Sequence, residues 1–260
     1  MFSLRDRQKC EELFKKYYQG RTFYDAKYRA LIREHVQAGQ RILDAGCGRY
    51  LRFSKELADS CEVVGIDLEA PLETTNSGSP YGVCGDLSHL PFRSECFDLV
   101  ISRSVVEHLE DPSRVFREFS RILRSGGKVV IVTPNKYDYV SLVAAVTPHK
   151  FHQFLVSRIF RVPTDDVFPT LYRANTMSSI RKALTAAGLI EKHLDTVNHY
   201  PAYLMFSPIL FRLGVCYERL TSLRPFRSLR GSILCVFEKE GARQMAVGDP
   251  QSLSSAPVAS

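Results

Sequence analysis

Short apolar runs alternate with amphipathic stretches between Arg41 and Asn135. The clearest runs are CEVVGIDL, FDLVIS and KVVIVTP, which are rich in Val, Ile and Leu. Runs of this length and composition indicate buried β-strands, and the stretches between them indicate helices. Strands that alternate with helices form a parallel sheet with helices on both faces. We therefore predict an α/β core over residues 41–135.

The segments on either side of this core have patterns of their own. Residues 5–37 carry helical signals and many aromatic side chains, and we expect a helical cap that packs over the open edge of the sheet. Residues 136–175 are dense in aromatic residues, His and Pro, which predicts an inserted lid after the fifth strand. Beyond the lid, MSSIRKALTAAGL has the pattern of an amphipathic helix, and LIEKHLDTVN and RGSILCVFEKE predict the last two strands.

A second insertion, residues 200–226, separates those two strands. Pro208 and Arg212 interrupt its apolar run, so it cannot span a bilayer, and it suits an interfacial helix, a wall of an apolar pocket or ordinary core packing. The Ser-, Ala- and Pro-rich end predicts a disordered tail. The expected organisation is one domain over residues 1–240, made of a cap (1–40), the core (41–135), the lid (136–175) and the sheet completion (176–240), followed by the tail (241–260).

The first strand of the core runs directly into an acidic residue and two glycines, in the order RILDAGCG. Gly46 and Gly48 permit a tight turn in which the backbone approaches a ligand closely. A dinucleotide site would carry a third glycine, but Leu51 stands at that position. The acidic Asp44, two residues before Gly46, therefore points to a different nucleotide-type cofactor.

This D-A-G-C-G turn resembles motif I of the class I S-adenosylmethionine-dependent methyltransferases. Four further segments resemble later motifs of that family in the right order, and all five lie within residues 41–135, about a third of the chain. The resemblance implies a Rossmann-like, mostly parallel sheet of seven strands with an antiparallel seventh strand, and S-adenosylmethionine as the cofactor. It implies a cofactor site made of Asp44, Ala45, Gly46, Cys47, Gly48, Asp67, Leu68, Asp86, Leu87 and Ser102.

The resemblance also implies roles for some of these residues. Asp67, at the end of the second strand, would accept hydrogen bonds from the ribose hydroxyls, and Asp86 would accept one from the adenine amine while Leu87 packs on the ring. The sequence departs from the family pattern at Tyr50, where many members carry a glycine. It departs again over residues 69–81, which are too rich in Pro, Gly and Ser for the usual helix.

Charge and cysteine content narrow the setting. The net charge of +7 allows an anionic partner such as nucleic acid, acidic lipid or a phosphorylated substrate, and selects none of them. The seven cysteines form no C-x-x-C pair, which predicts core residues in a reducing compartment, and the charged N-terminus lacks a signal-peptide core, so we expect a cytoplasmic protein. Basic residues are concentrated near the C-terminal end of the chain, at Arg212, Arg219, Arg224, Arg227 and Arg230. These arginines form either a solvated face or a contact with an anionic membrane.

A hydroxyl acceptor must lose a proton when it takes a methyl group, so a general base is expected. The candidates are His108, in the E-H-L segment after the fourth strand, and the lid residues His149 and His152. The two lid histidines have no third metal ligand at a suitable spacing, so we predict no metal site. Asp165, Asp166 and Tyr24 are secondary candidates for contact with substrate or cofactor, with turn capping or core packing as the alternative.

Together these features favour O-methylation of a hydrophobic or amphipathic small molecule or lipid-like intermediate. RNA is a less favoured acceptor, since the arginines are not organised with a stacking platform. A non-catalytic protein that binds S-adenosylmethionine, and an RNA or protein methyltransferase, remain alternatives. The sequence leaves the oligomeric state open.

Overall fold

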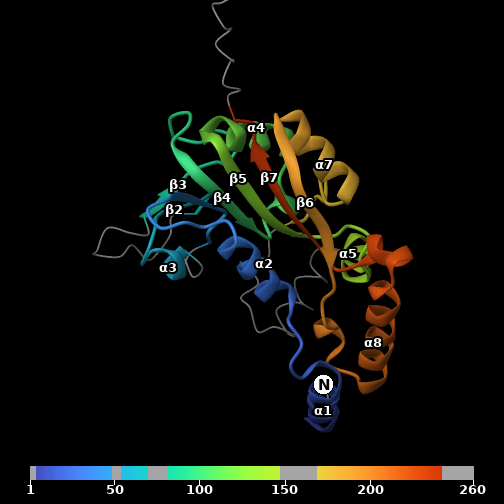
Figure 1. Ribbon diagram of the computed structural model, residues 1–260. Helices are drawn as coiled ribbons and strands as arrows, with labels where there is room; N and C mark the ends of the chain where they lie inside the picture. The colour runs from blue at the N-terminus through green and yellow to red at the C-terminus, as the bar shows by residue number, and fades with distance from the viewer. Residues whose placement is uncertain (1–3, 49–53, 70–80, 147–168, 242–260) are drawn as a thin grey trace, which may run out of the picture.

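The computed structural model describes residues 4–48, 54–69, 81–146 and 169–241. Its centre is one sheet of seven strands in the order β3-β2-β1-β4-β5-β7-β6 (Figure 1). Every strand pair is parallel except those of β7, which runs antiparallel to both of its neighbours. The predicted fold class is therefore confirmed. The strands are β1 (Arg41–Ala45), β2 (Glu62–Asp67), β3 (Tyr81–Cys84), β4 (Phe97–Arg103), β5 (Leu123–Pro134), β6 (Leu189–Val197) and β7 (Ser232–Lys239).

Helices cover both faces of this sheet, as the alternating pattern predicts. On one face, α4 (Pro112–Ile122) and α7 (Met177–Ala186) pack Phe116, Phe119 and Ile180 against the strands. On the other face, α2 (Tyr24–Arg33) contributes Tyr28 and Ile32 to a second cluster, and α3 (Ser54–Leu57) contributes Leu57. The central strands are thus buried on both sides, which explains their nearly continuous apolar sequences.

Helix α4 begins at an acidic cap and ends where β5 begins. Asp111 caps its N-terminus by accepting a hydrogen bond from the Arg114 amide, and Pro112 occupies the first turn. The helix ends at Ile122, because Leu123 pairs with Phe97 as the first residue of β5.

The N-terminal cap lies in a different place from the one expected. Helix α1 (Leu4–Tyr18) packs against α8 (Pro208–Ser222), as Figure 1 shows at the bottom of the molecule, and does not cover an edge of the sheet. Phe14, Tyr18 and Phe23 join Tyr200 and Phe211 in a separate apolar cluster. The inner face of α8 therefore buries the aromatic side chains of the cap.

The second insertion supplies this partner. It consists of η3 (Ala202–Leu204), α8 and η4 (Arg224–Leu229). Arg230 fixes the end of this segment to β6, because its guanidinium donates hydrogen bonds to the carbonyls of Thr196, Thr221 and Ser222. Within the lid, the structure describes α5 (Tyr139–Val146); residues 147–168 lie outside the described residues.

The seven cysteines are all free thiols, and most fit the expected core role. Cys10, Cys61, Cys96 and Cys235 are buried and Cys47 is half-buried. Cys84 and Cys216 are exposed, so the core interpretation is wrong for these two.

Candidate cofactor site and acceptor cavity

The turn after β1 is built by backbone geometry that its glycines allow. Gly46 and Gly48 have φ angles of 78° and 68°, in the left-handed region that favours glycine. The Gly46 amide donates to the Ile66 carbonyl at 2.8 Å, so the end of β2 holds the turn. A Cβ on Gly46 would lie 2.1 Å from Cγ2 of Val105, which leaves no room for a side chain. The turn is therefore pressed between β2 and the loop after β4.

Asp67 ends β2 directly beside this turn. Its Oδ2 accepts a hydrogen bond from the Gly48 amide at 2.8 Å, and its Oδ1 accepts a longer one from the Glu69 amide at 3.4 Å. Each carboxylate oxygen has a second lone pair, so the group can also accept hydrogen bonds from a ligand. Leu68, the next residue, exposes most of its apolar side chain. The ribose role of Asp67 stays a prediction.

Asp44 and Ser102 lie beneath the turn. Asp44 is buried. Burial of the Tyr28 phenol raises the pKa of that phenol well above its ordinary value, and the negative charge of Asp44 raises it further. The Ser102 hydroxyl donates to the Ala45 carbonyl at 3.0 Å, which ties β4 to the end of β1. Burial, followed by the charges of Asp44 and Asp67, raises the pKa of the Cys47 thiol. Cys47 is therefore a neutral thiol and not a nucleophile at pH 7.

The predicted adenine pair is only partly placed for that role. Asp86 is exposed and accepts hydrogen bonds from the amide and hydroxyl of Ser88, at 2.8 Å and 2.6 Å. Both hydrogen bonds lower the pKa of Asp86, and the one from the Ser88 hydroxyl has the larger effect, so the carboxylate stays ionised at neutral pH. Leu87, in contrast, is buried within the core cluster. The adenine role stays a prediction for both residues.

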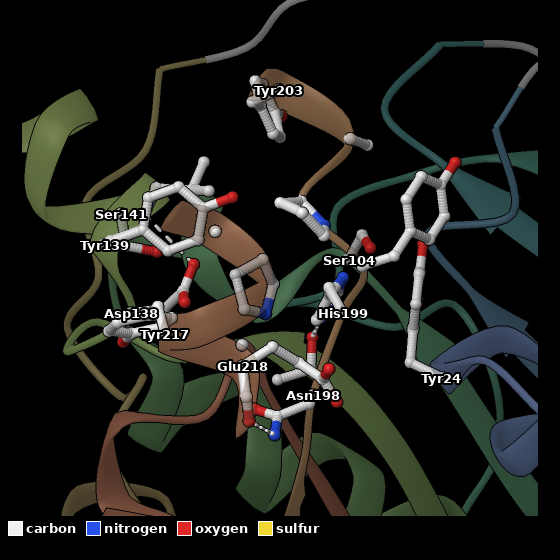
Figure 2. Close-up of a pocket in the computed structure, with 18 of the residues that line it drawn as sticks. Tyr24, Ser104, Asp138, Tyr139, Ser141, Asn198, His199, Tyr203, Tyr217 and Glu218 are labelled. Carbon is white, nitrogen blue, oxygen red and sulfur yellow. Dashed lines mark hydrogen bonds between the residues drawn. The ribbon is translucent and has the colours of Figure 1, made fainter. Parts of the chain in front are cut away.

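A cavity of about 480 Å³ lies at the carboxyl end of β4 (Figure 2). Ser104, directly after β4, lines it, and the neighbouring Val105 is the residue that faces Gly46. Its other walls come from α2, from the start of the lid, from residues 198–203 and from α8. The acidic side chains on its lining are Glu107, Asp138 and Glu218, and the tyrosines are Tyr24, Tyr139, Tyr172, Tyr200, Tyr203 and Tyr217.

Asp138 is the carboxylate of the lid segment that faces this cavity. It is buried, and its Oδ2 accepts a hydrogen bond from the Val140 amide at 3.1 Å. Burial raises the pKa of Asp138 to about 6, opposed by the backbone hydrogen bonds at the start of α5. In Figure 2 it lies beside Tyr139 and Tyr217, so its surroundings are mostly aromatic. The group is mainly ionised at pH 7 and takes up a proton just below it.

His199 lies on the opposite wall. Its ring stacks on Tyr24 with the centroids 4.2 Å apart, and its Nε2 is 2.6 Å from the Ser232 hydroxyl. Burial lowers the pKa of His199 to about 4, so the ring is neutral at pH 7. A Cβ on Gly231 would lie 2.1 Å from the ring, so this glycine provides the space that the histidine occupies.

Two further acids are fixed by partners. Glu107 is buried and accepts a hydrogen bond from the Thr133 hydroxyl at 2.9 Å, and burial raises the pKa of this carboxyl. Thr133 in turn accepts one from the Asn175 side chain at 2.6 Å, so the start of α7 is linked to β5. Glu218 is buried on α8 and forms a bidentate ion pair with Arg21, with N–O distances of 3.1 Å and 3.2 Å.

The predicted general bases are placed less directly. The Nδ1 of His108 donates to the Pro169 carbonyl at 2.7 Å, and its Nε2 is 3.9 Å from Glu107; its ring is not part of the cavity lining. His149, His152, Asp165 and Asp166 lie outside the described residues. Tyr24 does line the cavity. Among the described residues, no three His, Cys, Asp or Glu side chains converge as a metal site would require.

Sequence reasoning missed Asp138, His199 and Glu218. The first two had a usable signal, because each closely follows the carboxyl end of a predicted strand, where ligands bind in sheets of this type. Glu218 had none, since its role depends on a partner in a helix at the other end of the chain.

Comparison with known proteins agrees with this geometry. Residues 43–131 match the methyltransferase domain family. Over 176 residues the chain is 28% identical to a malonyl-[acyl-carrier protein] O-methyltransferase from Legionella pneumophila, covering 58% of this chain and 61% of the relative. Over 126 residues it is 35% identical to a tRNA (carboxymethyluridine(34)-5-O)-methyltransferase from Arabidopsis thaliana, covering 46% and 30%. The chain thus spans less than two thirds of either relative.

The fold comparison gives the same class. A solved S-adenosylmethionine-dependent methyltransferase from Mesorhizobium loti superposes with a TM-score of 0.54 at 20% identity, covering 81% of this chain and 96% of the other. The domain match over residues 43–131 and the shared fold both support the class I S-adenosylmethionine-dependent methyltransferases as the class that this chain resembles. S-adenosylmethionine is the cofactor of that class, and the residues around the Gly46 turn fit it.

Proposed function

We propose that this protein transfers the methyl group of S-adenosylmethionine to a hydroxyl oxygen of a hydrophobic or amphipathic small molecule or lipid-like intermediate. The observation that carries the proposal is the cavity at the carboxyl end of β4, which combines a tyrosine-rich lining with the buried carboxylate of Asp138. The aromatic walls suit an apolar body, and the acids suit a polar end that donates hydrogen bonds. We place the reaction in the cytoplasm.

Methyl transfer is an in-line displacement, so the acceptor oxygen must approach the methyl carbon from the side opposite the sulfur. Positioning of the two reactants can supply up to about 7 to 11 kcal/mol in favourable systems. Ser104 lines the cavity and the next residue, Val105, packs against Gly46, so an acceptor in the cavity would lie close to a cofactor bound at the turn. The protein's main contribution is to hold this alignment and exclude water.

We assign the acceptor's proton to Asp138. With a pKa of about 6 it is an ionised, buried base at neutral pH, and its Oδ1 is not used by the Val140 hydrogen bond. His199 is a weaker base, because its pKa is about 4. We retain His108 as the second candidate, since its Nε2 is an acceptor when Nδ1 donates to Pro169.

RNA and protein acceptors are the second candidates, and the Arabidopsis thaliana relative is the reason to test RNA. Three acidic side chains line the cavity, and these disfavour a phosphate backbone close to it. A non-catalytic binding protein would take up S-adenosylmethionine but transfer nothing.

The test begins with calorimetry of S-adenosylmethionine binding. It continues with transfer of a labelled methyl group from S-adenosylmethionine into cell extracts that have been separated into lipid, metabolite, RNA and protein fractions. We expect label in an alkali-stable ether or an ester of the lipid or metabolite fraction. Label found only in RNA or protein would contradict the proposed acceptor, and binding without any transfer would indicate the non-catalytic alternative.

The role of Asp138 is tested by Asp138→Asn, in which the amide oxygen can still cap α5. Wild-type turnover should rise as pH increases through about 6, as the carboxyl loses its proton. The variant should lose at least about a hundredfold in turnover, which is the low end for removal of a general base. It should also lose the limb near pH 6 and keep its cofactor affinity. The exposed Asp59→Asn is the control, and wild-type turnover in Asp138→Asn would remove the assignment.

A further inference from the structure

Helix α8 is apolar on its outer face as well as on its inner face. The inner face buries Phe211 and Val215 in the cluster with α1. The outer face carries Ile209, Leu213 and Leu220, whose exposed fractions are 70%, 59% and 47%. Their spacing of four and seven residues places all three on one side of a helix. A helix on the surface of a globular protein ordinarily presents polar residues there.

The apolar surface continues past the end of the helix. Leu223 and Phe226, in and beside η4, are 55% and 38% exposed. Cys216, at the same helical side as Leu213 and Leu220, is exposed too. We call this set the α8 stripe: Ile209, Leu213, Cys216, Leu220, Leu223 and Phe226.

Within residues 208–229 the exposed charges all have one sign. Arg212 and Arg219 are exposed on one edge of α8, and Arg224 and Arg227 are exposed on η4. Glu218 is the only acidic residue in residues 208–229, and it points inward, where it pairs with Arg21. Arg230, which the sequence grouped with these arginines, is half-buried and occupied by backbone carbonyls, so it does not belong to this surface.

We propose that the α8 stripe docks on an anionic phospholipid membrane. An apolar helix face with cationic residues beside it lies in the plane of the interface, with its apolar side chains at the boundary between headgroups and acyl chains. The four arginines would contact the lipid phosphates. A second copy of this chain fits less well, because a symmetric contact through this face would bring the same arginines of both copies together.

The same helix connects this surface to the cavity. Gly214, Tyr217 and Glu218 line the cavity from the inner face of α8, so a docked membrane lies about one helix diameter, roughly 10 Å, from the cavity wall. With this placement, an amphipathic acceptor can enter the cavity from the bilayer. This step rests on the proposed function. None of the described helices is long and apolar enough to cross a membrane.

The test is flotation of the full-length protein with two kinds of vesicle, phosphatidylcholine alone and phosphatidylcholine with phosphatidylserine. We expect binding to the second kind at low salt, and weaker binding as salt rises, because exposed charges are screened beyond about 8 Å at physiological ionic strength. Changing Ile209, Leu213 and Leu220 together to Ser should lower the partition coefficient at least tenfold. Changing Arg212, Arg219, Arg224 and Arg227 together to Gln should abolish the preference for phosphatidylserine.

Matched controls lie elsewhere on the surface. Ile190→Ser with Leu171→Ser removes exposed apolar side chains, and Arg33, Arg93, Arg117 and Lys182 changed to Gln remove the same number of charges. Both controls should float as the wild type does. A wild type that does not float at low salt would overturn the proposal, as would a stripe variant that floats normally.

A dimer that the stripe variant loses in light scattering would also overturn it and identify a second copy as the occupant. Flotation needs no methyl transfer. Its failure would therefore leave the proposed function intact, and a failed transfer assay would leave the docking result intact.

Discussion

Asp67 is the residue on which the cofactor site depends most. It holds the Gly48 amide and has lone pairs to spare for the ribose hydroxyls. Hydrogen bonds to charged groups contribute about 1.5 to 3 kcal/mol each, so Asp67→Ala should weaken S-adenosylmethionine binding at least about tenfold. Titration calorimetry measures this, with Asp59→Ala as the exposed control. Tight binding of NAD in place of S-adenosylmethionine would contradict the cofactor assignment.

A variant of His108 distinguishes between the two candidates for the general base that removes the acceptor's proton, Asp138 and His108. Because its ring holds the Pro169 carbonyl and stays outside the cavity lining, His108→Ala should lower turnover less than Asp138→Asn does and leave cofactor affinity nearly unchanged. Steady-state rates of both variants with one acceptor decide the order. If His108→Ala loses the limb near pH 6 and Asp138→Asn keeps it, the histidine is the base.

At the scale of elements, the contact between α1 and α8 rests on one buried acid. Arg21→Met removes the ion-pair partner of Glu218 and leaves that buried carboxylate with one side-chain donor among the described residues, the Tyr18 hydroxyl, 3.3 Å away. Arg21 is half exposed, so part of the loss is screened, and we expect a decrease of about 1 to 3 kcal/mol in the free energy of unfolding. Urea denaturation measures it.

The control is Arg7→Met, which removes an exposed pair with Glu11 on the same helix. Exposed pairs of this kind contribute at most about 0.5 kcal/mol. Equal losses for the two variants would mean that burial of Glu218 is not what makes its ion pair important.

The elements that the sequence predicted well are those in which every residue has a similar environment, so that the local sequence is enough to identify them. Strands β1, β2, β4 and β5 are buried on both faces, so their apolar runs are enough to locate them, and the glycine turn follows from local backbone geometry. The docking of α1 is different. Phe14 and Tyr18 indicate that one face of the helix is buried. The sequence of the helix itself does not show whether that face packs on the sheet edge or on α8. Glu218 was missed for the same reason, since it takes seven separate segments to bring the cavity residues together.

For the molecule as a whole, His199 makes stability depend on pH. The unfolded chain protonates this residue near pH 6.5 and the folded chain only near pH 4, so the folded state loses stability as pH falls between these values. Asp138 acts in the opposite direction from about pH 6 to 3.8, because its pKa is raised on folding. The advantage in thermal midpoint of wild type over His199→Asn should therefore shrink from pH 6.5 to pH 4.

The matching measurement on Asp138→Asn should give the reverse trend, with the wild type gaining relative to the variant as pH falls below about 6. A difference between wild type and either variant that stays constant over this range would show that the residue titrates alike in the folded and unfolded chains.

The ion pair near Tyr18 also sets an order of events during synthesis. All the groups that shape the Gly46 turn have been made once the ribosome has passed residue 105, whereas Tyr18 must wait 200 residues for Glu218. Chains emerge N-terminus first, and regions that are complete can begin to fold before the rest appears. A growing chain thus has every residue of the Gly46 turn long before it has the α8 wall of the acceptor cavity. A messenger cut short after β5 would encode the turn without that wall.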